Sequence, residues 1–374
     1  MYNRTLITLV QLKMQEETLY LILYGAATML SLTACCYLLL RRSNAIVPDV
    51  TSPVRLRWWT AAFFASMTLS HIWYLPTFYF TANDDKLLGT LIGATLDFLT
   101  LVPLGIVVLM SMLQDRRRPL WLAGVMMVPI IAVMTVCIAN CSITLLPVVY
   151  VYYLSLGIGL IIYMVREVRQ YGRWLRDNYA DLEHKEVWQS FVVLAVILLF
   201  FGIYTLDPHG LAYQYATQVN NIILVCYLVW RVETLSELNV TPPATVMNGD
   251  DLPQAIHDHI GILLQQHCID TQLYLQHDLS LQQLAKAIGT NRYYLSQYFS
   301  SQGTTYNAYI NGQRIEHFMN LYHKAVATQQ FFTAQQFAME SGFHNYRTFS
   351  NAFKHLTGQT VTGWMKTQQR MGEC

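Results

Sequence analysis

The stretch that decides the fold lies near the C-terminus and reads SLQQLAKAIG at residues 280–289, followed by NRYYLSQYF at residues 291–299. A second stretch, TAQQFAMESG at 333–342 followed by NYRTFSNAFK at 345–354, repeats the plan. Each copy has the signature of a helix capping box and then a Gly where the chain turns, because Gly tolerates positive φ. These positions are Ser280 with Gln283, Thr333 with Gln336, Gly289 and Gly342.

The second helix of each copy has one apolar face. Leu295 and Phe299, and likewise Phe349 and Phe353, are four residues apart and so lie on one side of a helix. The opposite side carries Arg, Asn, Gln, Ser and Lys. A capped helix, a Gly turn and a second helix with a polar face predict a helix-turn-helix, whose second helix enters the DNA major groove.

This doubled unit resembles the DNA-binding domain of the AraC/XylS family of transcription regulators, over about residues 275–366. The resemblance rests on Leu-Ala-x-x-Ile-Gly from Leu284, Tyr-Leu-Ser from Tyr294, Arg-Ile-Glu from Arg314, Gly-Phe at Gly342 and Phe-Lys-x-x-Thr-Gly from Phe353. It implies that one chain binds two successive major-groove segments, about 34 Å apart, of double-stranded promoter DNA.

Composition predicts a second, membrane-embedded part. The chain has 374 residues, of which 53% are hydrophobic and 13% charged, against about 25% charged in soluble domains. The net charge is only +1, but from residue 281 onwards eight Lys and Arg face three Asp and Glu, a local excess of five. A basic C-terminal domain suits a phosphate backbone. The seven Cys have no paired spacing, so we expect no disulfide framework or zinc motif. No other metal and no cofactor are expected.

Hydropathy predicts seven membrane spans, most of them near the roughly 20 residues that cross the hydrocarbon core. Their approximate ranges are 19–40, 58–80, 87–113, 120–139, 143–165, 189–206 and 211–230. The first is too long for a cleaved signal peptide, so we interpret it as a spanning helix. Pro76 and Pro103 are predicted to kink their helices.

The loops between these spans predict their orientation. Loops 41–57, 114–119 and 166–188 carry four, three and five Lys or Arg, whereas the alternate loops carry only Lys86. Positive loops favour the cytoplasmic side. The N-terminus is therefore expected outside, and the C-terminal domain in the cytosol beneath the inner membrane of a bacterium.

The expected fold class is all-α: a seven-transmembrane helix bundle over residues 1–239, a linker over 240–252 and an AraC-type double helix-turn-helix domain over 253–374. Thr241-Pro242-Pro243 breaks helix and marks the linker. Further helices are expected at about 253–268, 306–327 and 360–369, the last with Trp364 buried.

A homodimer is one expected partner state. Val232, Leu235 and Leu238 recur at three-residue steps, which fits either a dimer seam or a frayed amphipathic helix end.

Ten residues are predicted to contact DNA. They are Asn291, Arg292, Tyr293, Ser296 and Gln297 in the first copy, and Asn345, Arg347, Ser350, Asn351 and Lys354 in the second. Arg can pair with guanine and Asn or Gln with adenine, whereas Lys354 and Arg347 suit phosphates equally. Asn291 and Asn345 also fit helix N-caps. Arg314 is expected to be structural or to face a phosphate.

Four polar residues inside the expected spans are candidates for a signal pocket: His71, Asp97, Gln214 and Gln218. Ionisable groups in a bilayer are costly, so they suggest a site for a small extracytoplasmic ligand. Hydrogen bonding between helices is the alternative.

These features predict a membrane-anchored one-component transcription regulator. The alternative is a membrane protein whose helix-turn-helix domain serves as a protein-interaction adaptor without binding DNA. An enzyme is not expected, because the sequence has no Gly-rich phosphate loop, G-x-S-x-G, H-E-x-x-H or C-x-x-C motif.

Overall fold

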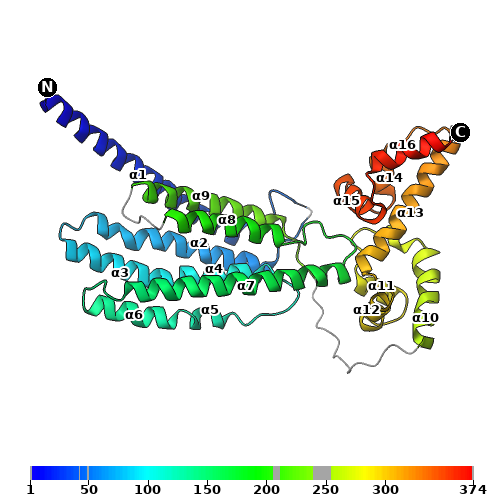
Figure 1. The fold of residues 1–374 in the computed structure, drawn as a ribbon, viewed down its shortest axis with the longest axis horizontal. Coiled ribbons are helices and arrows are strands. Elements are labelled where there is room, and N and C mark those ends of the chain that lie inside the picture. Colours follow the sequence, from blue (N-terminus) through cyan, green and yellow to red (C-terminus); the bar gives the residue numbers. More distant parts are fainter. Residues whose placement is uncertain (1, 42, 49, 205–210, 239–253, 373–374) are drawn as a thin grey trace. The chain divides into compact units, whose positions relative to one another are not determined.

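The computed structural model describes residues 2–41, 43–48, 50–204, 211–238 and 254–372, and within these ranges it is helical, with no strand and one isolated bridge between Tyr179 and Ser280 (Figure 1). The helices are α1 (Tyr2–Leu40), α2 (Val54–Tyr74), η1 (Leu75–Phe78), α3 (Asn83–Leu99), α4 (Leu101–Ser111), α5 (Trp121–Val125), α6 (Val128–Ala139), α7 (Leu146–Asn178), α8 (Trp188–Tyr204), α9 (Leu211–Thr234), α10 (Gln254–Leu264), η2 (Gln265–Ile269), η3 (Leu273–Leu275), α11 (Leu281–Ala287), α12 (Arg292–Ser301), α13 (Tyr306–Ala327), α14 (Ala334–Glu340), α15 (Tyr346–Thr357) and α16 (Val361–Gly372).

The chain divides into two compact units. The bundle unit comprises Met1–Arg169 and His184–Val240, and the C-terminal unit comprises Gln170–Glu183 and Thr241–Cys374. The predicted linker, 240–252, lies outside the described residues. The grouping of Gln170–Glu183 with the C-terminal helices was not foreseen from the sequence.

Four described helical stretches are long and apolar enough to cross a membrane; the first three lie in the bundle unit, and the fourth begins there and ends in the C-terminal unit. They are Thr18–Leu40, Asn83–Ser111, Trp121–Ala139 and Leu146–Asn178. The other three expected spans are helical as α2, α8 and α9, but do not reach that combined length and apolarity within the described residues. The count of seven spans therefore remains a prediction.

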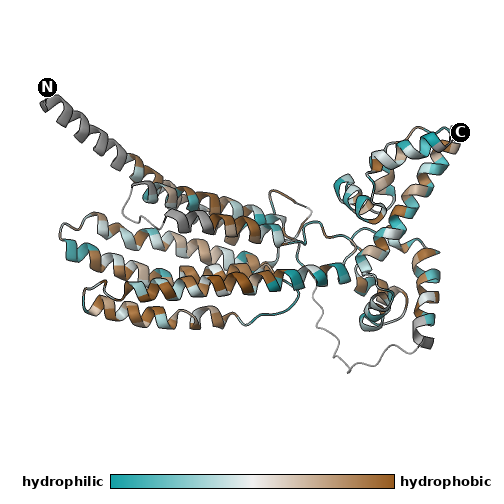
Figure 2. Ribbon diagram, viewed as in Figure 1, coloured by the Kyte–Doolittle hydropathy of each residue, from teal (hydrophilic) through white to brown (hydrophobic). Residues whose placement is uncertain are grey.

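The surface of α7 is unusual for a protein in water. Only 11% of its most apolar stretch is buried, and Figure 2 shows it brown over most of its length and teal at its C-terminal end. A helix with this much exposed apolar surface is stable where the surrounding solvent is itself apolar.

Both prolines expected to kink a helix lie at a break. The expected span 87–113 is divided between α3 and α4 at Thr100, because the ring of Pro103 clashes with the carbonyl four residues earlier, that of Leu99. Pro76 lies in the 3₁₀ turn η1 that follows α2.

The three residues predicted as a possible dimer seam are not exposed, so the prediction of a dimer contact there is wrong. The exposed fractions of Val232, Leu235 and Leu238 are 0%, 0% and 7%, so all three pack inside their own chain. The neighbouring Glu233 is also buried. Its carboxylate accepts hydrogen bonds from the backbone N–H groups of Ala45 (2.8 Å) and Ile46 (2.9 Å). This region thus fixes the end of α9 to the loop after α1.

The C-terminal unit has two apolar cores joined by α13. Ile310 of α13 packs with Leu284, Leu295 and Phe299 in the first core. Eight residues further along the same helix, Phe318 belongs to the second core. That core also contains Phe337, Phe349, Phe353 and Trp364, the last buried as predicted. One continuous helix thus fixes the two halves relative to each other.

Candidate nucleic-acid interface

The first helix-turn-helix, α11 and α12, forms as its sequence predicts. Ser280 and Gln283 make the reciprocal capping box, with the Ser280 N–H donating to Gln283 Oε1 at 2.8 Å and the Gln283 N–H donating to Ser280 Oγ at 3.3 Å. Gly289 has a φ of +74° at the turn. The apolar face of α12, Leu295 and Phe299, is buried.

The second unit, α14 and α15, differs in one detail. The Thr333 hydroxyl accepts a hydrogen bond from the Gln336 N–H at 3.1 Å. The predicted reciprocal bond is not made, because the Gln336 side chain instead donates to Glu340 Oε1 at 2.8 Å. The turn residue Gly342 has a φ of +89°, and a Cβ added there would lie 2.7 Å from the Leu275 carbonyl oxygen. This position therefore accepts only Gly without a backbone shift.

Asn291 and Asn345, the residues that precede α12 and α15, are confirmed as N-caps. The Asn291 side-chain oxygen accepts the Tyr294 N–H at 2.9 Å, and the Asn345 oxygen accepts the Thr348 N–H at 2.9 Å. Each cap satisfies a backbone donor of the first turn and so fixes where the helix begins.

The predicted reading residues of α12 are less exposed than expected. Arg292, Tyr293, Ser296 and Gln297 are all half-buried. Tyr293 and Gln297 are paired, the Gln297 amide donating to the Tyr293 hydroxyl at 2.8 Å. Two polar side chains one helical turn apart therefore form a fixed pair on one side of the helix.

On α15 three of the predicted side chains share one face. Arg347, Asn351 and Lys354 are all exposed, and their spacing of four and then three residues places them on one side of the helix. Ser350 is half-buried beside them. Of the two second helices, α15 thus has the more open polar surface.

Arg314 does not face a phosphate. Its side chain is 1% exposed, and it donates to the carbonyls of Tyr274 and Gln276, both at 2.7 Å. Its role is therefore structural.

A segment that sequence reasoning missed, Tyr179–Glu183, packs against these helices within the C-terminal unit. We call it the docked segment. The Ala180 N–H donates to the Leu279 carbonyl at 3.3 Å, and the Asn307 amide of α13 donates to the carbonyls of Tyr179 and Ala180 at 3.1 and 2.6 Å. No sequence motif pointed to these contacts, because they depend on tertiary placement.

The candidate signal-pocket residues are partly brought together in the bundle unit. His71 of α2 and Gln218 of α9 are both buried, and their side chains are hydrogen-bonded at 2.9 Å. Asp97 is half-buried beside Ser70 and Trp73 of α2. Gln214 is half-buried. The His71–Gln218 bond is the interhelical contact that the alternative interpretation expected.

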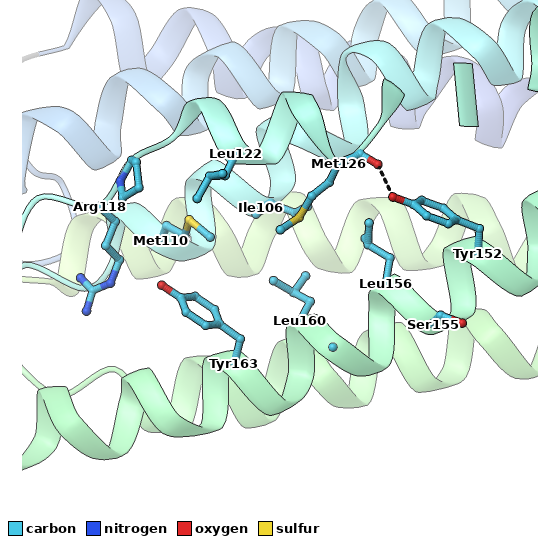
Figure 3. Close-up of a pocket in the computed structure, with 12 residues that line it drawn as sticks. Ile106, Met110, Arg118, Leu122, Met126, Tyr152, Ser155, Leu156, Leu160 and Tyr163 are labelled. Carbon is cyan, nitrogen blue, oxygen red and sulfur yellow. Dashed lines mark hydrogen bonds between the residues drawn. The ribbon is translucent and has the colours of Figure 1, made fainter. Parts of the chain in front are cut away.

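A cavity of 550 Å³ lies elsewhere in the bundle unit, between α4, α5 and α7, and none of the four candidate pocket residues lines it. Figure 3 shows Leu156, Leu160 and Tyr163 of α7 along one side of it. The Tyr152 hydroxyl donates to the Met126 carbonyl at 3.0 Å near one end. The lining is mostly apolar, with Arg118, Tyr152, Ser155 and Tyr163 as its polar members.

Comparison with known proteins covers the C-terminal unit. Residues 284–367 match a family described as a helix-turn-helix domain. Similar proteins include HTH-type transcriptional regulators of Staphylococcus aureus strains COL, MSSA476 and MRSA252, each 32% identical over 114 residues, which is 29% of this chain and 15% of the relative. The matched region thus spans only a small part of these relatives. No solved structure shows significant similarity to the chain.

Residues 284–367 therefore form a helix-turn-helix domain, in agreement with the two helix-turn-helix units of the structure. The relatives that match this region are named as transcriptional regulators. Several membrane-length apolar helices precede the domain.

Proposed function

We propose that this chain is a membrane-anchored transcription regulator that binds promoter DNA sequence-specifically through α12 and α15. The observation that carries the proposal is that two N-capped helices with polar faces are held on one joining helix, α13. Fixed spacing between two such helices is what a chain needs to enter two successive major-groove segments.

In this proposal the exposed polar face of α15 contacts DNA directly. Asn351 would pair with an adenine edge, and Arg347 with a guanine edge or a phosphate. Lys354, near the end of the helix, would hold a phosphate and so position the protein without reading sequence. On α12, Arg292, Ser296 and the Tyr293–Gln297 pair would contact the neighbouring groove segment.

The bundle unit is proposed as a seven-pass anchor in the bacterial inner membrane, with the N-terminus outside and the C-terminal unit in the cytosol. The exposed apolar surface of α7 supports placement in a membrane. The basic loops 41–57, 114–119 and 166–188 support the orientation. His71, Asp97, Gln214 and Gln218 are proposed to sense a small extracytoplasmic ligand. A homodimer would double the number of contacted groove segments.

The experiment is a binding titration of the full chain in phospholipid nanodiscs against duplex DNA at increasing salt. A regulator should prefer particular sequences and lose affinity steeply as salt rises, because phosphate contacts release counterions. A protein-interaction adaptor would show neither a sequence preference nor a steep salt dependence.

A further inference from the structure

The docked segment reaches the beginnings of both second helices of the C-terminal unit. Its first residue, Tyr179, is close enough to Arg292, the first residue of α12, for the two side chains to interact electrostatically. Its last residue, Glu183, contacts Asn345, the N-cap of α15. Five consecutive residues thus connect the two helix ends that the proposed function assigns to DNA.

At the α12 end, Arg292 is half-buried, so its guanidinium is partly removed from solvent. Burial lowers the pKa of the Arg292 guanidinium, with Tyr179 acting in the opposite direction, and an Arg remains protonated regardless. The Tyr179–Ser280 bridge and the Ala180–Leu279 backbone bond fix the segment against the start of α11. The Arg292 guanidinium is therefore charged but only partly accessible to solvent.

At the α15 end, the contact is made by a carboxylate. Glu183 Oε2 accepts hydrogen bonds from the Asn345 amide and from the Thr348 hydroxyl, the latter at 3.3 Å. Asn345 therefore uses its oxygen to cap the helix and its nitrogen to hold Glu183. Hydrogen bonds to an ionised group are about twice as strong as neutral ones.

Further contacts hold the segment between these ends. The Asn307 and Asn311 amides of α13 both donate to the Ala180 carbonyl, at 2.6 and 3.1 Å. Asp181 lies 3.5 Å from His344 Nε2, and Asp278 lies 3.0 Å from the same atom. The segment is thus held along its length by three different elements of the unit.

We propose that the docked segment is an intramolecular partner of the DNA-binding surface and competes with DNA for the N-termini of α12 and α15. The inference rests on the proposed function. In a helix-turn-helix, the N-terminal residues of the second helix contact base edges. A Glu carboxylate at that position occupies the donors of Asn345 and Thr348 and repels an approaching phosphate.

The segment is also placed to transmit a signal. It follows α7 directly, and α7 is one continuous helix from Leu146 to Asn178 that includes a membrane-length apolar stretch. A shift of α7 along or about its axis would move Tyr179 and the residues after it. The bundle would thereby change the fraction of molecules in which the surface is open, and apparent DNA affinity scales with that fraction.

The test uses the full chain in phospholipid nanodiscs and a fluorescein-labelled duplex of mixed sequence, with dissociation constants from fluorescence anisotropy. Two variants release the segment in different ways. Glu183→Gln weakens the contact with Asn345 and Thr348, and Asn307→Ala removes a neutral anchor without changing any charge. The matched controls are Glu186→Gln, in the same loop, and Asn320→Ala, an exposed residue of the same helix α13.

We expect both release variants to bind the duplex about ten-fold more tightly than wild type, and both controls to bind as wild type does. Asn307→Ala changes no charge, so tighter binding by this variant would come from release of the segment and not from a lost negative charge near DNA. DNA binding by all five proteins with equal affinity would overturn the competition while leaving the proposed function intact. No binding by any of the five, at any salt concentration, would overturn both.

Discussion

The Arg314 guanidinium lies 5.6 Å from the centre of the Phe343 ring, at the junction of the two helix-turn-helix units. Arg314 belongs to the joining helix α13, and Phe343 follows the turn after α14. The same guanidinium donates to the carbonyls of Tyr274 and Gln276, which precede the first unit. One buried side chain therefore links the joining helix to both units.

Replacing this side chain should loosen the junction. Arg314→Lys keeps the charge but loses the planar donor fork and its stacking on Phe343, so we expect a loss of about 1–3 kcal/mol in the stability of the C-terminal unit. Hydrogen exchange of the full chain, measured peptide by peptide, should show faster exchange in both α11 and α14.

The control for this change is Arg347→Lys, at an exposed position of α15, where we expect an effect within about 0.5 kcal/mol. If α11 and α14 exchanged hydrogen equally slowly in Arg314→Lys and in Arg347→Lys, a structural role for Arg314 would be contradicted.

The two turn glycines should respond unequally to the same substitution. Gly289→Ala meets nothing within 4 Å and should cost about 1 kcal/mol, because only the positive φ disfavours Ala. Gly342→Ala meets the same conformational cost and also the Leu275 carbonyl oxygen at 2.7 Å, so it should cost at least twice as much. Hydrogen exchange at increasing urea measures the stability that each variant loses. A larger loss in Gly289→Ala than in Gly342→Ala would show that the turn after α14 is not held against Leu275.

The tandem motif was predictable from sequence because its determinants are local. Capping side chains, turn glycines and apolar pairs four residues apart act within one or two helical turns, so the joining helix 306–327 and both Asn caps were predicted correctly. The second capping box was wrong in its reciprocal half because Glu340, one turn further along, offers Gln336 a charged acceptor.

The buried thiol of Cys268 should be nearly inert. Burial raises its pKa to about 11, so roughly one thiol in a thousand is ionised at pH 8, against roughly a quarter for an ordinary Cys. Because the thiolate is the reactive form, N-ethylmaleimide should modify the exposed Cys141 at least a hundred-fold faster. Peptide mass spectrometry of the native chain measures both rates, with the urea-unfolded chain as the control in which both sites react. Comparable native rates would contradict the burial of Cys268.

Two exposed side chains of α15 should differ in what they contribute to DNA binding. Asn351→Ala should relax base preference at one position by about 1–3 kcal/mol, whereas Lys354→Ala should weaken binding to all sequences and reduce the salt dependence. Selection from a randomised duplex pool, followed by salt titration, distinguishes the two effects. A uniform loss in Asn351→Ala would reassign that residue to a phosphate contact.

The docked segment, the buried seam and the bundle cavity could not be predicted in the same way. Tyr179–Glu183 has no motif, and its contacts with Asn307 and Asn345 join residues more than a hundred positions apart. Val232 and Leu235 have the spacing of an exposed seam, yet the chain folds over them. Periodicity shows that a face is apolar but does not show what covers it.

Sequence-specific DNA binding is tested most directly by selection of binding sites from randomised duplex DNA by the full chain in phospholipid nanodiscs. A regulator with two fixed reading helices should enrich a sequence with two elements about one helical turn apart and should bind it more weakly as salt rises. Recovery of unenriched sequences, together with salt-independent or absent binding, would contradict sequence-specific DNA binding.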